Sequence, residues 1–151
     1  MTLHVELVVP DREIWSGTAR MVIAKTHDGD IGVMGSHPPV IGLLADGSVV
    51  RILDAESTGS GESRGNGSGP GGQSAGASGE VIAAVSGGFL SVADDRVSIL
   101  ARQAELGSEV DTSAARAELE EASADGTAAG GEEAAEARYA RARLRAAGEQ
   151  A

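Results

Sequence analysis

The sequence contains no cysteine, so it can form neither a disulfide framework nor a thiolate-based site. Aromatic residues are almost as scarce, with one Trp, one Tyr and one Phe in 151 residues. Sugar-binding faces usually depend on aromatic rings, so this scarcity argues against a carbohydrate-binding module. The lack of cysteine suits a reducing compartment, and we expect a cytoplasmic protein.

Basic residues and long apolar runs are also in short supply. The chain has 12 basic against 23 acidic residues and a formal net charge of -11, which argues against binding to nucleic acid. The longest apolar runs, such as residues 38–45, fall far short of the roughly 20 residues that a spanning helix needs. A secretory signal begins with basic residues followed by an apolar stretch, but this region of the sequence contains Glu6, Asp11 and Glu13. We therefore expect no signal peptide, and any membrane association should come through a partner.

The patterns typical of catalytic and metal sites are missing as well. The three histidines, His4, His27 and His37, lack a spacing that would aim two imidazoles at one metal, so a cupin-like metalloenzyme is only an alternative. Residues 86–88, Ser-Gly-Gly, lack a nucleophile elbow and are interpreted as a turn. Glu13, Asp28 and Asp30 are interpreted as solvated turn carboxylates and not as an acid–base pair. The sequence predicts no catalytic residue, no metal and no cofactor.

A nucleotide site is excluded at the glycines between residues 29 and 35. No Lys-Ser or Lys-Thr follows them, and Pro38-Pro39 prevents the helix that a phosphate-binding loop must open.

The same prolines stiffen the turn around His37, which would hold its imidazole in a defined place. A simpler interpretation is that His37 hydrogen-bonds its own loop.

The first two thirds of the chain alternate apolar and polar residues with a period of two. In Leu3–Val9 the apolar residues share one face, which predicts a strand. The pattern recurs at residues 21–26, 31–34, 40–44, 49–53, 81–85, 89–92 and 97–100. Turn residues separate the runs at positions 16–17, 28–29, 46–47, 87–88 and 94–95. Many short strands without an intervening helix predict an all-β antiparallel sandwich or barrel, and we expect the sandwich.

Two composition changes divide the chain. Residues 56–79 are almost wholly Gly, Ser, Ala and Glu and predict a disordered insert within one sandwich domain, residues 1–106. Residues 107–151 have helical character, with Asp111 or Ser108 as cap of a helix through Glu121 and a second helix from Glu132 to Ala147. The sequence therefore predicts a carboxyl-terminal helical hairpin.

The hairpin has few large apolar residues with which to hold one packing. After Val110 they are Leu119, Tyr139 and Leu144, each worth about 1.5 to 3 kcal/mol if fully buried. Ordering the backbone costs on the order of 1 to 2 kcal/mol per residue. We therefore predict a mobile tail. Its second helix carries Arg138, Arg141 and Arg145 on one face, which is either a solvated surface or a set of guanidinium groups suited to a partner's carboxylates.

Several ordered motifs give the sequence a family resemblance. They are Val-Pro-Asp-Arg-Glu-Ile-Trp-Ser-Gly at 9–17, Asp-Gly-Asp-Ile-Gly-Val-Met-Gly-Ser-His-Pro-Pro at 28–39, Ser-Gly-Gly-Phe-Leu-Ser-Val at 86–92, Val-Ser-Ile-Leu-Ala at 97–101 and Ala-Glu at 104–105. In this order they resemble the epsilon subunits of the bacterial F-type proton-translocating ATP synthase. The resemblance covers residues 3 to about 122, apart from the insert.

The resemblance implies a ten-stranded sandwich and a two-helix domain in the central stalk of the rotary enzyme. Such a subunit binds the gamma subunit and the c-ring, couples proton flow to ATP synthesis, and lies on the cytoplasmic face of the cell membrane. The loop at 28–39 would contact the c-ring and gamma, with Asp28, Asp30 and His37 as contact residues.

The resemblance also implies a role for the tail. In the family the tail folds onto the sandwich or extends toward the alpha/beta catalytic head, where it inhibits ATP hydrolysis. Arg138, Arg141 and Arg145 would then contact the head. Relatives that bind ATP carry an arginine where Ala114 stands in this chain, so no ATP binding by the tail is expected.

Overall fold

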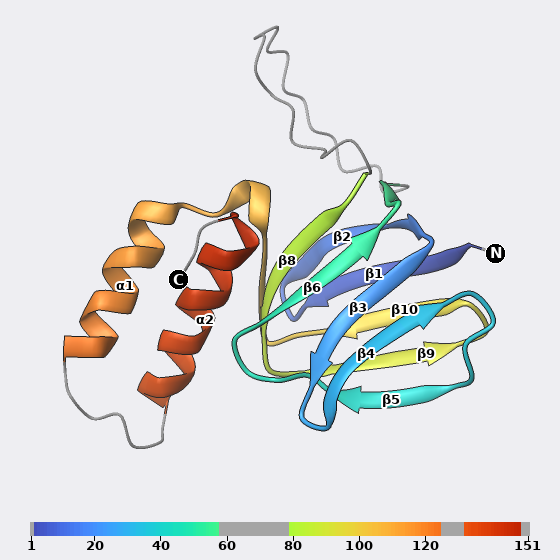
Figure 1. Cartoon of the computed structure of the whole chain (residues 1–151), viewed down its shortest axis with the longest axis horizontal. Helices are drawn as coiled ribbons and strands as arrows, with labels where there is room; N and C mark the ends of the chain where they lie inside the picture. The colour runs from blue at the N-terminus through green and yellow to red at the C-terminus, as the bar shows by residue number, and fades with distance from the viewer. Residues whose placement is uncertain (1, 58–78, 125–131, 149–151) are drawn as a thin grey trace, which may run out of the picture.

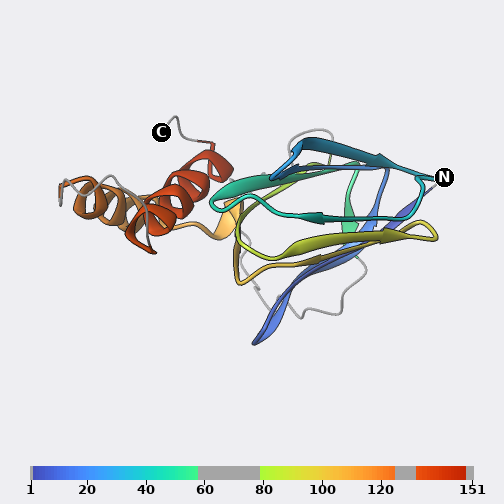
Figure 2. The ribbon, with the colours of Figure 1, turned by 90° about the horizontal axis from the view of Figure 1, so that it is seen from below.

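The computed structural model describes residues 2–57, 79–124 and 132–148. These residues form two β-sheets stacked face to face, with a pair of helices at one end of the stack (Figure 1). Seen from below, the two sheets lie as separate layers and the helices extend to one side of them (Figure 2). The predicted sandwich followed by a helical pair is confirmed.

The described residues contain eleven strands, a 3₁₀ helix and two α-helices. The strands are β1 (Leu3–Val9), β2 (Arg12–Ala19), β3 (Met21–Thr26), β4 (Gly29–Met34), β5 (Val40–Leu43), β6 (Ser48–Leu53), β7 (Glu56–Ser57), β8 (Val81–Ser86), β9 (Phe89–Ala93), β10 (Arg96–Leu100) and β11 (Gln103–Leu106). The helices are η1 (Gly107–Glu109), α1 (Thr112–Ala124) and α2 (Glu132–Ala146).

The two sheets have different strand orders. One sheet runs β5-β9-β10-β1-β2-β7 and the other β11-β8-β6-β3-β4. Most neighbouring strands are antiparallel, but β1 and β10 are parallel, with Leu7 opposite Ile99. The predicted antiparallel sandwich is confirmed in its dominant pairing, and β1 with β10 is the parallel pair among the described strands.

The core lies between the two sheets and consists of the inward members of each alternating strand. In β1 the inward residues Leu3, Val5 and Leu7 are at most 2% exposed, while His4 between them is exposed. Val22, Val50, Ile52, Val85, Leu90, Val97 and Ile99 complete the largest part of this core. Burial of aliphatic area on both inner faces thus stabilises the sandwich.

The predicted turn at Ser16-Gly17 is wrong, because both residues lie inside β2. Gly17 pairs with Val5 and also with Ser57 of β7. A Cβ at Gly17 would lie 2.1 Å from the carbonyl oxygen of Glu56 and 2.7 Å from the Trp15 ring. Glycine is needed here for close approach of backbone and ring, and not for chain reversal.

The predicted insert falls mainly outside the described residues. Residues 58–78 are not described, whereas Glu56 and Ser57 form β7 against β2. The strand pattern resumes at β8, which pairs with β6 across the insert. The two flanks of the insert therefore belong to one sandwich.

The helical pair begins as the sequence predicts. Asp111 caps α1, since its Oδ1 accepts a hydrogen bond from the backbone N–H of Ala114 at 3.1 Å. The helix α2 lies against β8 and β6 on the outer face of one sheet. Small residues make this contact: Ala84 of β8 is buried with Ala142 and Ala146 of α2. No helix of the described residues is long and apolar enough to cross a bilayer.

Candidate partner-binding surfaces

The turn at Asp28 is fixed by a side-chain hydrogen-bond pair. The Thr26 hydroxyl donates to the carbonyl oxygen of Gly29 at 2.7 Å, and the backbone N–H of Asp28 donates to the same hydroxyl at 3.2 Å. Gly29 takes a φ of 123°, which a residue with a side chain rarely adopts. Asp28 and Asp30 are both exposed, and Asp30 lies opposite Lys25 on the neighbouring strand β3.

The loop that carries His37 is tied to the other sheet. The backbone N–H of Ser36 donates to the Asp95 carboxylate in the turn between β9 and β10. The His37 backbone N–H donates to the Met34 carbonyl, and its ring Nδ1 lies 2.7 Å from the Pro38 carbonyl oxygen. The half-buried imidazole is therefore held by its own loop, as the simpler interpretation predicts.

Asp28 and His37 do not meet at one point. They lie beyond opposite ends of β4, a strand of six residues that spans about 20 Å. Since β4 is the last strand of its sheet, its outer edge has no neighbouring strand in the described part of the chain. The predicted contact residues thus mark a long sheet edge with a turn at each end.

A second surface, which the sequence reasoning missed, is apolar and exposed. Ile41 is 75% exposed, Leu43 62%, Phe89 41% and Leu100 39%. Leu43, Phe89 and Leu100 face one another across β5, β9 and β10 in one cross-strand row. The signal was present in the sequence, because residues 40–44 are apolar on both faces of the strand, apart from a glycine. We call these four residues the apolar patch.

The three arginines predicted to share a face of α2 are all exposed, but only two of them line a common groove. Arg138 and Arg145 line a groove of about 570 Å³ beside β3 and β6, where Lys25, Asp30 and Asp46 also lie. Arg141 is exposed and is not among the residues that line this groove. The three arginines predicted to act together are thus divided in this arrangement.

Arg143, which lies beside these arginines on α2, connects the helix to β11 and to α1. Its Nε donates to a Glu105 carboxylate oxygen at 2.8 Å, and its NH1 donates to Glu118 at 2.7 Å. Its guanidinium carbon also lies 5.8 Å from the centre of the Tyr139 ring. Burial raises the pKa of Tyr139 to about 12, the charge of Glu105 adds to this rise, and the positive charge of Arg143 opposes it.

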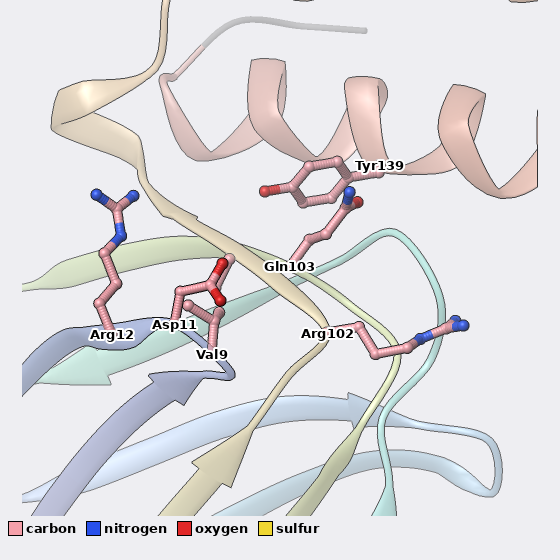
Figure 3. Close-up of a pocket in the computed structure, with 7 residues that line it drawn as sticks. Val9, Asp11, Arg12, Arg102, Gln103 and Tyr139 are labelled. Atoms are coloured by element: carbon pink, nitrogen blue, oxygen red, sulfur yellow. The ribbon is translucent and has the colours of Figure 1, made fainter.

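The cleft under α2 does not gather reactive groups. Its lining includes Asp11, Arg12, Arg102, Gln103 and Tyr139, and its volume is about 440 Å³. Figure 3 shows Arg12 and Arg102 pointing away from one another. Arg102 instead pairs with Asp46 at 3.2 Å. Within the described ranges, no group of three or more His, Cys, Asp or Glu side chains could hold a metal ion.

Comparison with known proteins gives consistent matches. The model of the family described as ATP synthase, Delta/Epsilon chain, beta-sandwich domain matches residues 2–60. The chain is 49% identical over 144 residues to the ATP synthase epsilon chain of Thermobifida fusca, covering 95% of this chain and 88% of that protein. It is 44% identical over 127 residues to the epsilon chain of Streptomyces avermitilis, covering 83% and 84%.

A solved structure also shares the fold. A chain of the Euglena gracilis mitochondrial ATP synthase, in a structure of OSCP, F1 and c-ring, superposes with a TM-score of 0.63. The match covers 97% of this chain and 79% of that chain at 20% sequence identity. At this identity the match supports the sandwich-and-helices fold alone.

Proposed function

Because this chain belongs to the family of bacterial ATP synthase epsilon chains, we propose that it is a non-catalytic stalk subunit that couples rotation to ATP synthesis through its outer surfaces. The observation that carries this proposal is the 49% identity over 95% of the chain. Membership of this family also argues against the two alternatives for a β-sandwich, a cupin-like metalloenzyme and a carbohydrate-binding module.

The apolar patch is the surface best suited to a permanent neighbour, for which we propose the gamma subunit. Ile41, Leu43, Phe89 and Leu100 expose aliphatic and aromatic area on one sheet face. Exposed apolar area of this kind is stabilised when a partner covers it, and permanent interfaces are the more hydrophobic ones. A rigid sheet beneath the patch would transmit torque without deforming.

The edge formed by β4 and its two turns is the proposed contact with the c-ring. Asp28 and Asp30 supply exposed carboxylates at one end, and His37 lies in the stiff loop at the other. An exposed edge about 20 Å long, with carboxylates at one end and Met34 exposed at the other, fits a row of repeated loops better than a single pocket would. Through this contact the subunit would lie at the cytoplasmic face of the cell membrane.

We propose that residues 1–106 and 107–151 act as two units, with the tail able to leave the sandwich and reach the alpha/beta catalytic head. There Arg138, Arg141 and Arg145 would pair with carboxylates and oppose ATP hydrolysis. Truncation of this protein after Gly107 should therefore raise the rate of ATP hydrolysis by the assembled enzyme and leave its assembly intact. An unchanged hydrolysis rate would contradict the inhibitory role only.

Reconstitution tests the stalk role itself. An ATP synthase preparation stripped of its epsilon chain should regain proton pumping per ATP hydrolysed when this protein is added back. A matched addition of Leu43→Ser protein, altered in the apolar patch, should restore less coupling at equal concentration. If the unaltered protein restored no coupling, that result would contradict the proposed function.

A further inference from the structure

Arg143 joins three separate elements through two ion pairs. From α2 its guanidinium reaches Glu105 on β11 at 2.8 Å and Glu118 on α1 at 2.7 Å. Its side chain is only 11% exposed, whereas Glu118 is 56% exposed. Three further ion pairs, Arg20–Asp54, Arg51–Glu80 and Arg102–Asp46, lie within the sandwich.

The apolar contact between α2 and the sandwich is small. Its buried members are Ala84, Ala142 and Ala146, with Val49, Ile82 and Tyr139 packed around them. An alanine methyl group removes little area from water, so much of the apolar burial here comes from Val49, Ile82 and Tyr139. The ion pairs of Arg143 add a polar contribution to the docking of α2.

The fit of α2 on the sandwich is nevertheless close at two places. A Cβ at Gly47 would lie 2.3 Å from the carbonyl carbon of Arg138, and one at Gly107 would lie 2.0 Å from the Ala146 carbonyl oxygen. These backbone contacts lie at the middle and at the carboxyl end of α2, and Arg143 stands between them in sequence. The docked position is thus well defined, and in it Arg143 lies within reach of both carboxylates.

We propose that Arg143 is the latch of the helical tail: its simultaneous pairing with Glu105 and Glu118 sets how readily α2 leaves the sandwich. A guanidinium that is largely removed from water is stabilised by its partners, and losing one of them leaves a poorly solvated charge. Glu105 links the hairpin to the sandwich, and Glu118 links its two helices. Release of Arg143 therefore loosens both contacts together.

The regulatory meaning of the latch rests on the proposed function. While α2 is docked, Arg138 and Arg145 line the groove beside Lys25 and Asp30, and both are exposed there. A latch that opens more readily lets α2 carry these arginines away from the sandwich toward another subunit. The latch itself is a property of the isolated chain and can be tested without the rest of the enzyme.

Amide hydrogen exchange in the isolated full chain tests the latch. Arg143→Gln should accelerate exchange across residues 140–146 by at least about tenfold and leave β9 and β10 protected. The matched control is Arg141→Gln, which removes an exposed arginine from the same helix with the same change of helix propensity. Equal exchange rates in the two variants would overturn the latch.

A double variant keeps the test decisive if Arg143→Gln also disturbs folding. Glu105→Gln alone should accelerate exchange in α2, and adding Arg143→Gln should produce less than the product of the two single effects, because both remove the same pair. If the exchange rate of the double variant equalled the product of the two single effects, the pairing of Arg143 with Glu105 would be contradicted. In assembled ATP synthase, faster exchange without lower hydrolysis would count against the inhibitory tail and leave the latch supported.

Discussion

Gly47 and the backbone of Arg138 are in such close contact that no side chain fits between them. A Cβ built on Gly47 would come within 2.3 Å of the Arg138 carbonyl carbon and 2.4 Å of its Cβ. Gly47 lies in the turn before β6, and Arg138 lies on α2, more than ninety residues later in the printed sequence. This contact shows how the tail is seated on a turn of the sandwich.

Gly47→Ala should therefore displace α2. The substitution also strains the backbone, since Gly47 has a φ of 63°. Gly29→Ala is the matched control, because Gly29 has a φ of 123° but no described atom within 4 Å of a built Cβ. Amide exchange in α2 should speed up by at least about fivefold in Gly47→Ala and stay unchanged in Gly29→Ala. Equal exchange rates in the two variants would show that the Gly47 contact does not position α2.

The parallel pair of β1 and β10 should be a main source of stability. Leu7 and Ile99 are opposite one another and fully buried. Ile99→Ala should lower the free energy of unfolding by about 2 to 5 kcal/mol in urea titrations. Leu100→Ala, at a neighbouring position that is 39% exposed, should cost less than about 1 kcal/mol. Similar losses in both variants would contradict the assigned core.

Substitution in the apolar patch should separate binding from folding. Leu43 is 62% exposed, so Leu43→Ser should change the unfolding free energy by no more than about 0.5 kcal/mol. Binding to purified gamma subunit should weaken at least about tenfold, because a large exposed apolar side chain of the interface is replaced by a small polar one. Arg96→Ser, exposed on the same sheet but outside the patch, is the control. Undiminished binding by Leu43→Ser would remove the patch from the interface.

Tyr139 gives a pH signature of the docked tail. Its pKa is raised from 10.0 to about 12, mainly by burial. Because the folded protein holds this proton more tightly, its contribution to docking is complete below pH 10 and is lost as the pH rises through about 12. Tyrosinate absorbance should titrate near 12 in the native chain and near 10 in denaturant. The chain has one Tyr, so a native midpoint near 10 would mean that the ring is not docked.

The strands of the sandwich could be predicted because its core obeys a local rule. Alternation in Leu3–Val9 fixed both the strand and its buried face, and Asp111 revealed the start of α1. β2 was missed as a periodic run because its buried positions hold the small residues Gly17 and Ala19. β11 was missed because its buried position holds the small residue Ala104 between Gln103 and Glu105. The parallel pairing of β1 with β10 joins distant segments, which no local pattern encodes.

The seating of the tail could not be predicted for a related reason. Counting large apolar residues suggested weak packing, yet α2 packs through alanines and through glycines that admit its backbone. Arg143 and Glu105 are 38 residues apart, so their pairing follows from the fold alone. The prediction of a mobile tail stays open, and exchange rates in α2 test it. Of the predicted contact residues, Asp28, Asp30 and His37 proved to lie along one edge, a relation the motif alone did not reveal.

Co-purification tests the central claim most directly. A tagged copy of this chain, recovered from its own cells under conditions that preserve large complexes, should bring down the gamma subunit at a fixed stoichiometry together with the rest of the ATP synthase. Leu43→Ser protein, which stays folded, should recover less gamma. Recovery of the unaltered chain alone under these conditions would contradict the assignment as a stalk subunit.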